Sequence, residues 1–230
     1  MTADKGSYWR SADEDEAMQD EHGFVWRSML DTIDTNLAAR RVLDAGCNRG
    51  GFLRLLSDRA GIAQGFGYDP AWMAIEDARR LAGSRPLRFE VTHTVPGDWR
   101  GFDAAFSHEV LYLIHELSAH ALAIFDALAP GGSYHAVMGV HDASPLMVEW
   151  HRQQVDELDL PPLYSIDEVV DVFQAVGFQA AVARLKMGFI PARDRTADHD
   201  SDPTTGRDLL RWLDYYNDEK LLLRFTRPDA

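Results

Sequence analysis

Apolar and polar positions alternate along the chain in blocks typical of strands separated by helices. Short apolar runs have the length of buried strands, and they cover 41–45, 65–69, 102–108 and 133–140. Between these runs, apolar side chains recur at helical spacing, most clearly over 72–81 and 117–128. Strands that alternate with helices predict a doubly wound α/β fold, a parallel sheet with helices on both faces. Ligands of this fold class bind at the carboxyl ends of the strands.

The second half of the chain continues the pattern less regularly. Ser165 and Glu168 have the spacing of a capping box at the start of a helix. We expect the remaining strands at 86–93, 178–185 and 220–226, and one more helix over 24–39. With no repeat and no linker, the pattern predicts one domain over 1–230.

A glycine-rich turn connects the first predicted strand to the helix after it. The segment VLDAGCNRGG places Gly46, Gly50 and Gly51 within six residues, directly after Asp44. Such a strand–turn–helix unit brings the backbone close to a ligand. Asp69 ends the next strand, at the position from which a carboxylate accepts hydrogen bonds from ribose hydroxyls. A bare structural turn is the alternative interpretation.

The run from Gly46 reads G-C-N-R-G-G, with Asn48 where a dinucleotide fingerprint has its second glycine. This departure disfavours NAD and FAD. The run closely resembles the nucleotide loop of the class I S-adenosylmethionine-dependent methyltransferases, which reads D/E-x-G-x-G-x-G. Asparagine tolerates left-handed backbone well, so Asn48 is compatible with the path of that loop. The resemblance extends over Val42 to Gly139, including GFGYDPAWMAIEDAR and FDAAFSHEVLYLI.

The resemblance implies a mostly parallel seven-stranded sheet with an antiparallel last strand, and S-adenosyl-L-methionine as the cofactor. It implies that the carbonyl of Gly46 and its neighbours hold the methionine ammonium, and that Asp69 takes the ribose. The residues carried over as cofactor-binding are Asp44, Gly46, Cys47, Asn48, Gly50, Asp69, Pro70, Trp72, Thr92, His93, Ser107 and His108. Thr92 and His93 stand where this family often has an acid near the adenine amine.

Methyl transfer is an in-line displacement, for which the protein aligns the partners and excludes water. A general base is needed only where the acceptor must lose a proton. The candidates follow the fourth and fifth strands: His108, Glu109 and His141, with Tyr112 and Asp142 beside them. An ordinary hydrogen-bonded role is the alternative for each of them.

Three segments outside the motifs are expected to shape an acceptor pocket. They are the acidic segment 1–22, which either packs on the domain or acts as a lid, and the inserts 141–165 and 188–219. Tyr8 and Trp9 stand out in the first segment, and Trp212, Tyr215 and Tyr216 in the last. Their aromatic character is typical of a small-molecule site.

The composition of the chain limits the classes of partner that we expect. The chain of 230 residues has a formal net charge of −14, from which we expect no nucleic acid and no membrane as partner. The aromatic segments favour a small-molecule methyl acceptor, and a protein substrate is the alternative. A single cysteine, no signal-peptide pattern and no long apolar run favour a cytoplasmic protein, and a homodimer is compatible with the sequence. The histidine spacings favour no metal site. The alternatives to an enzyme of this family are a catalytically inactive nucleotide-binding regulator and an NAD-dependent oxidoreductase.

Overall fold

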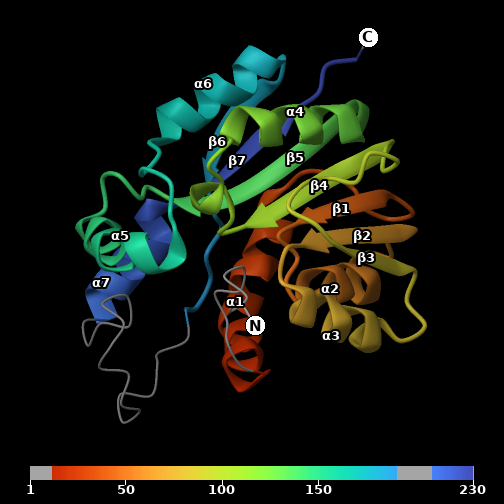
Figure 1. Ribbon diagram of the computed structural model, residues 1–230, viewed down its shortest axis with the longest axis horizontal. Coiled ribbons are helices and arrows are strands. Elements are labelled where there is room, and N and C mark those ends of the chain that lie inside the picture. The colour runs from red at the N-terminus through yellow and green to blue at the C-terminus, as the bar shows by residue number, and fades with distance from the viewer. Residues whose placement is uncertain (1–11, 191–208, 230) are drawn as a thin grey trace.

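The computed structural model describes residues 12–190 and 209–229. Its centre is one seven-stranded sheet in the order β3-β2-β1-β4-β5-β7-β6 (Figure 1). The strands are β1 (Arg41–Ala45), β2 (Gln64–Asp69), β3 (Leu87–Val91), β4 (Phe102–His108), β5 (Leu128–Gly139), β6 (Gln179–Arg184) and β7 (Lys220–Thr226). Neighbours from β3 to β5 run parallel, whereas β7 is antiparallel to both β5 and β6. The predicted fold class is confirmed.

Helices cover both faces of the sheet (Figure 1). They are α1 (Ala12–Thr32), α2 (Gly51–Ala60), α3 (Trp72–Ala82), α4 (Leu117–Ala127), α5 (Pro145–Leu158), α6 (Ile166–Val176) and α7 (Leu209–Asp214). A 3-10 turn covers Leu111–Leu113, and a π-helical turn covers Tyr215–Glu219. Two apolar clusters result: one joins α1, α2, α3 and α5 to the sheet, and the other joins α4 and α6 to its opposite face. The predicted capping box of Ser165 and Glu168 is present at the start of α6.

Two elements differ most from their predicted bounds, the first helix, which ends at Thr32 and not at residue 39, and the fifth strand. Helix α1 begins at Ala12, inside the acidic segment, because acidic residues are favourable near a helix N-terminus and the buried Val25 and Met29 anchor the helix further along. Strand β5 begins at Leu128 and continues through Gly131 and Gly132, whereas the predicted strand began at residue 133. The reason is tertiary: both glycines exchange backbone hydrogen bonds with Arg227, just beyond β7.

The inserts are only partly described. The first contains α5, whose buried Trp150 packs its ring 5.7 Å from that of Tyr112. In the last, 191–208 lies outside the described residues, as do Tyr8 and Trp9 in the N-terminal segment. No helix within 12–190 or 209–229 is long and apolar enough to cross a membrane.

Candidate functional site

The turn between β1 and α2 has the backbone that its sequence predicts. Gly46, Asn48 and Gly50 adopt left-handed φ values of 71°, 45° and 69°. At Gly46 a Cβ would lie 2.5 Å from Cγ2 of Val110, so only glycine fits there. Asn48 adopts the left-handed conformation at the one glycine position of the family pattern that this chain does not keep, which explains how the loop tolerates the exchange.

Asp69, at the end of β2, is held against this turn. Its Oδ2 accepts a hydrogen bond from the backbone N–H of Asn48 at 2.9 Å, and its Oδ1 accepts one from that of Ala71 at 2.9 Å. Pro70 lies inside the turn that the second bond closes. The two bonds fix the plane of the carboxylate.

Two polar side chains lie buried beneath the turn. Burial, with the negative charge of Asp69 nearby, raises the pKa of Asp44 well above its ordinary value. Burial likewise raises the pKa of the Cys47 thiol, so this cysteine is an unreactive interior residue. Both are placed to support the loop from below.

The other predicted cofactor residues are spread around this edge. Trp72 begins α3 with 54% of its surface exposed, and His93 is exposed after β3. Thr92 donates its backbone N–H to the carbonyl of Asp69, while its hydroxyl donates to Thr94. The hydroxyl of Ser107 lies 2.6 Å from that of Tyr134, on the α4 and α6 side of the sheet, so its backbone alone remains available to a ligand.

His108, the last residue of β4, is half-buried against α1. Trp26 donates its indole N–H to Nδ1 of His108 at 3.2 Å, and the ring centres of His22 and His108 lie 4.5 Å apart. Because Nδ1 is the acceptor, Nε2 carries the proton of the neutral ring. Burial lowers the pKa of His108 well below its ordinary value, and His22 and Lys220 lower it further. The ring is therefore a neutral donor whose Nε2 has no hydrogen-bond partner within the described residues.

Glu109 has a left-handed backbone, with φ 58°, and directs its carboxylate toward the start of β7. Its Oε1 lies 3.0 Å from Nζ of Lys220, which is 2% exposed and lies about 5 Å from the ring centres of Tyr215 and Tyr216 (5.1 and 4.9 Å). Burial alone would raise the pKa of Glu109, but Lys220 and His141 outweigh it and hold that pKa below its ordinary value. The carboxylate is thus ionised and fixed in place.

His141 packs beside this ion pair, fully buried. Its Nε2 lies 3.5 Å from Oε2 of Glu109, and its ring centre lies 4.3 Å from that of Tyr112. A Cβ on Gly139 would lie 2.8 Å from the imidazole, so the glycine makes room for it. Asp142, the neighbour of His141 in the sequence, is exposed instead. The carboxylate partner of His141 is Glu109.

The arrangement fits S-adenosylmethionine. A backbone cradle that a Cβ would fill at Gly46, the fixed carboxylate of Asp69 and the unpartnered Nε2 of His108 follow three neighbouring strands at one end of the sheet. Such a set can accept a ribose diol and donate to a polar group. Within the described ranges no three His, Cys, Asp or Glu side chains gather as metal ligands.

Comparison with known proteins identifies the class. The sequence profile of the methyltransferase domain family matches residues 15–182, so the chain belongs to this family. It is a class I, S-adenosylmethionine-dependent methyltransferase, as the loop motif implied. The cofactor prediction is confirmed, and the NAD-dependent alternative is wrong.

Solved structures share the fold. A methyltransferase from Haloferax volcanii, solved with the activator Trm112, superposes with a TM-score of 0.80 at 23% identity, covering 96% of both chains. A phosphoethanolamine N-methyltransferase from Haemonchus contortus, solved with S-adenosylmethionine, has a TM-score of 0.65 at 17% identity, over 89% of this chain and 52% of that one.

Curated relatives point to a different acceptor from the one expected. A tRNA U34 carboxymethyltransferase from Ectopseudomonas mendocina is 34% identical over 118 residues, 46% of this chain and 34% of the relative. One from Pseudomonas fluorescens is 31% identical over 139 residues, 56% and 39% of the two chains. The chain thus spans about a third of the length of these relatives. Their shared name overturns the expectation of a small-molecule acceptor and no nucleic-acid partner. That expectation rested on the net charge of the whole chain, which does not report the charge of a local surface.

Sequence reasoning missed two residues of the site. Trp26 and Lys220 contact His108 and Glu109 from 82 and 111 positions away in the chain. The available signals were a lysine at the start of the last predicted strand and a tryptophan in the first predicted helix, and neither signal specifies its partner.

Proposed function

We propose that the chain transfers a methyl group from S-adenosylmethionine to a uridine of tRNA, at the position named for its curated relatives. The observation that carries this proposal is the matched pair of features at the sheet edge: the left-handed cradle after β1 and the fixed carboxylate of Asp69. The names of the relatives support the acceptor class.

When bound, S-adenosylmethionine supplies a methyl group on a cationic sulfur that leaves as a neutral thioether. Asp69 accepts both ribose hydroxyls in this account, and the backbone around Gly46 faces the methionine end. Trp72 and Thr92 border the adenine. These residues bind and orient, and alignment of this kind contributes roughly 7–11 kcal/mol in favourable cases.

An acceptor O–H or N–H must lose its proton as the new bond to the methyl carbon forms. His141 is the base in this proposal. Its Nε2 faces the ionised Glu109 and so keeps its proton, which leaves the lone pair on Nδ1 to take the acceptor proton. Lys220 holds Glu109 in the position that orients the imidazole. His108, a neutral donor through Nε2, contributes a hydrogen bond to a polar atom of the bound partners.

The charges near the strand ends favour a methyl group over the carboxymethyl group of the relatives' name. A carboxylate on the transferred group needs a free cation opposite it. The buried ammonium of Lys220 already faces Glu109 at 3.0 Å. A second carboxylate there would leave the cluster with excess negative charge in a desolvated place.

The test is a transfer assay with the full chain, S-adenosylmethionine labelled in its methyl group, and a synthetic anticodon stem-loop with uridine at position 34. The same stem-loop with cytidine at that position is the control. We expect label in the uridine RNA only, and His141→Asn lowers the rate about 10²–10⁴-fold without weakening cofactor binding. Label in neither RNA, or equally in both, contradicts the proposed acceptor.

A further inference from the structure

Glu109 has a backbone conformation that glutamate rarely adopts. It follows β4 directly with a φ of 58°, in the left-handed region where glycine is the usual residue. A hydrogen bond holds it there, because its backbone N–H donates to the carbonyl of Val137 on β5 at 2.9 Å. Strained backbone of this kind is concentrated at functional sites. The glutamate at this position therefore indicates a function of its carboxylate that glycine would not supply.

The carboxylate lies beside the cradle that receives the methionine end of the cofactor in the proposed function. Val110, the next residue in the chain, has the Cγ2 that a Cβ on Gly46 would meet at 2.5 Å. Lys220 pairs with Gly139 in the antiparallel register of β7 and β5, which brings it to the end of the sheet where β4 ends. The ion pair of Glu109 and Lys220 therefore borders the place of the sulfur and its methyl group.

The ammonium of Lys220 has one carboxylate opposite it. Nζ lies 3.0 Å from Oε1 of Glu109, and no other carboxylate within 12–190 and 209–229 lies at ion-pair distance from Nζ. The two side chains are 3% and 12% exposed. On another side of the ammonium are the rings of Tyr215 and Tyr216, with their centres 5.1 and 4.9 Å from Nζ. A buried ammonium needs an anion close to it, and here the chain supplies that anion itself.

Two donors of one chemical class differ only at the transferred group. One is S-adenosylmethionine, and the other carries a carboxylate on the S-methyl carbon, so that it would transfer a carboxymethyl group. We call the second the carboxylated donor. In the proposed function Asp69 and the cradle at Gly46 contact parts that both donors share, so these residues do not distinguish them. Specificity is a difference between two affinities, and here it depends on the charges beside the methyl group.

We propose that Glu109 selects S-adenosylmethionine over the carboxylated donor by occupying the cation that the carboxylated donor would need. This inference rests on the proposed function and adds the residue that sets the donor specificity. With Glu109 in place, the carboxylated donor brings a second carboxylate to a single buried ammonium, and two like charges close together are disfavoured there. Without Glu109, the ammonium of Lys220 has no anion, and the carboxylate of this donor supplies one.

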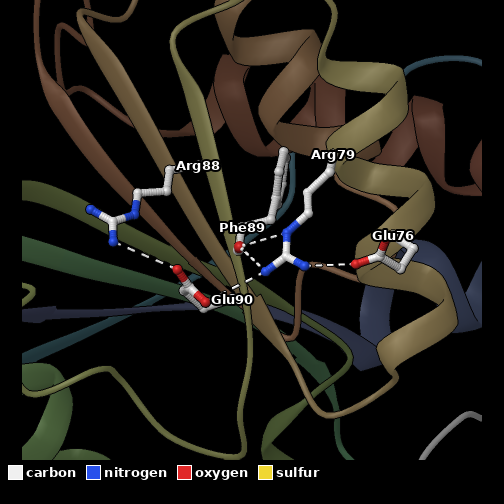
Figure 2. Close-up of polar contacts among 5 residues, drawn as sticks. All are labelled: Glu76, Arg79, Arg88, Phe89 and Glu90. Atoms are coloured by element: carbon white, nitrogen blue, oxygen red, sulfur yellow. Dashed lines mark hydrogen bonds and ion pairs between the residues drawn. The ribbon is translucent and has the colours of Figure 1, made fainter.

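The test is calorimetric titration of the full chain with each donor, without RNA, so that the role of Glu109 in orienting His141 does not enter. Glu109→Gln removes the charge at nearly constant volume, and Glu109→Gly also removes the backbone strain and opens space. Lys220→Met combined with Glu109→Gly removes the cation as well. The matched control is Glu76→Gln on α3, which packs on β2 and β3, because Glu76 pairs with Arg79 at 2.7 Å (Figure 2).

We expect the wild type and Glu76→Gln to prefer S-adenosylmethionine. Both Glu109 variants shift the affinity ratio toward the carboxylated donor by on the order of 10²-fold, because the donor gains a charged hydrogen bond, and the double variant loses this shift. Where the unpaired Lys220 lowers stability, thermal unfolding with each donor present gives the same comparison.

Two results would overturn the selection by Glu109, and they differ in what they mean for the proposed function. An affinity ratio that both Glu109 variants leave unchanged, in a wild type that prefers S-adenosylmethionine, overturns this inference alone. A wild type that prefers the carboxylated donor overturns the methyl group of the proposed function, and this inference with it.

Discussion

Replacing Lys220 with methionine isolates the buried ion pair behind the proposed base. Nζ of Lys220 lies 3.0 Å from Oε1 of Glu109, and the lysine is 2% exposed. The variant keeps much of the side-chain volume but leaves the carboxylate of Glu109 without its cation. Removing one partner of a buried pair costs about 3–5 kcal/mol, a large part of the 5–15 kcal/mol that stabilises a typical domain.

The loss depends on pH in a defined direction. In the wild type Lys220 and His141 hold the pKa of Glu109 below its ordinary value, so the pair stabilises the fold at neutral pH and less in acid. Without Lys220, burial raises the pKa of Glu109, which favours the fold below the ordinary value and penalises it above. The deficit of the variant is therefore largest near pH 7 and shrinks toward pH 4.

Thermal unfolding and urea unfolding at pH 7 and pH 4.5 measure this effect. We expect the melting temperature of Lys220→Met to fall by on the order of 10 °C at pH 7. The double variant Lys220→Met with Glu109→Gln recovers part of the loss, because no unpaired charge remains. A deficit below about 1 kcal/mol, or one equal at both pH values, would refute the reasoning.

Three further perturbations test separate parts of the account. Gly46→Ala brings a Cβ to 2.5 Å from Val110 and forces alanine to a left-handed φ of 71°. It should lower stability by about 1–3 kcal/mol in urea unfolding, with only partial rescue by Val110→Ala. Burial lowers the pKa of His135 to about 4, so acidification from pH 6.5 to 4 costs about 3 kcal/mol at this residue. His135→Phe should flatten stability against pH in that window, and an unchanged slope contradicts the assignment. Trp26→Phe removes the donor to Nδ1 of His108, and nitrogen NMR should then show a mixture of ring tautomers in place of one.

Local features of the sequence predicted the sheet and the cofactor end of the site. The alternation of apolar runs and helical spacing gave the strands, since both signals lie within single elements. The turn after β1 could be predicted down to the left-handed Asn48, because glycine spacing reports backbone conformation directly. The ribose-binding role of Asp69 was predicted from its place at the end of the strand that follows the turn.

Contacts between distant elements could not be predicted in the same way. Trp26 and Lys220 reach the site from α1 and β7, and only the folded sheet brings them to β4. The pairing of His141 with Glu109 rather than Asp142 depends on side-chain directions that sequence order does not give. Strand β5 runs through Gly131 and Gly132 because Arg227 pairs with them, a contact about 95 positions away.

The acceptor was misjudged because charge was averaged over the chain. A net charge of −14 describes the electrostatic field of the whole chain at long range, whereas an RNA partner contacts a limited part of the surface.

Calorimetric titration with S-adenosylhomocysteine tests the central claim most directly. The wild type, Asp69→Asn and the matched control Asp98→Asn, which neutralises an exposed acid beyond β3, are titrated under one condition, with NAD as a second ligand. The account predicts binding to the wild type and the control, at least about tenfold weaker binding to Asp69→Asn, and none of NAD. Equal affinity in all three proteins, or binding of NAD instead, would contradict it.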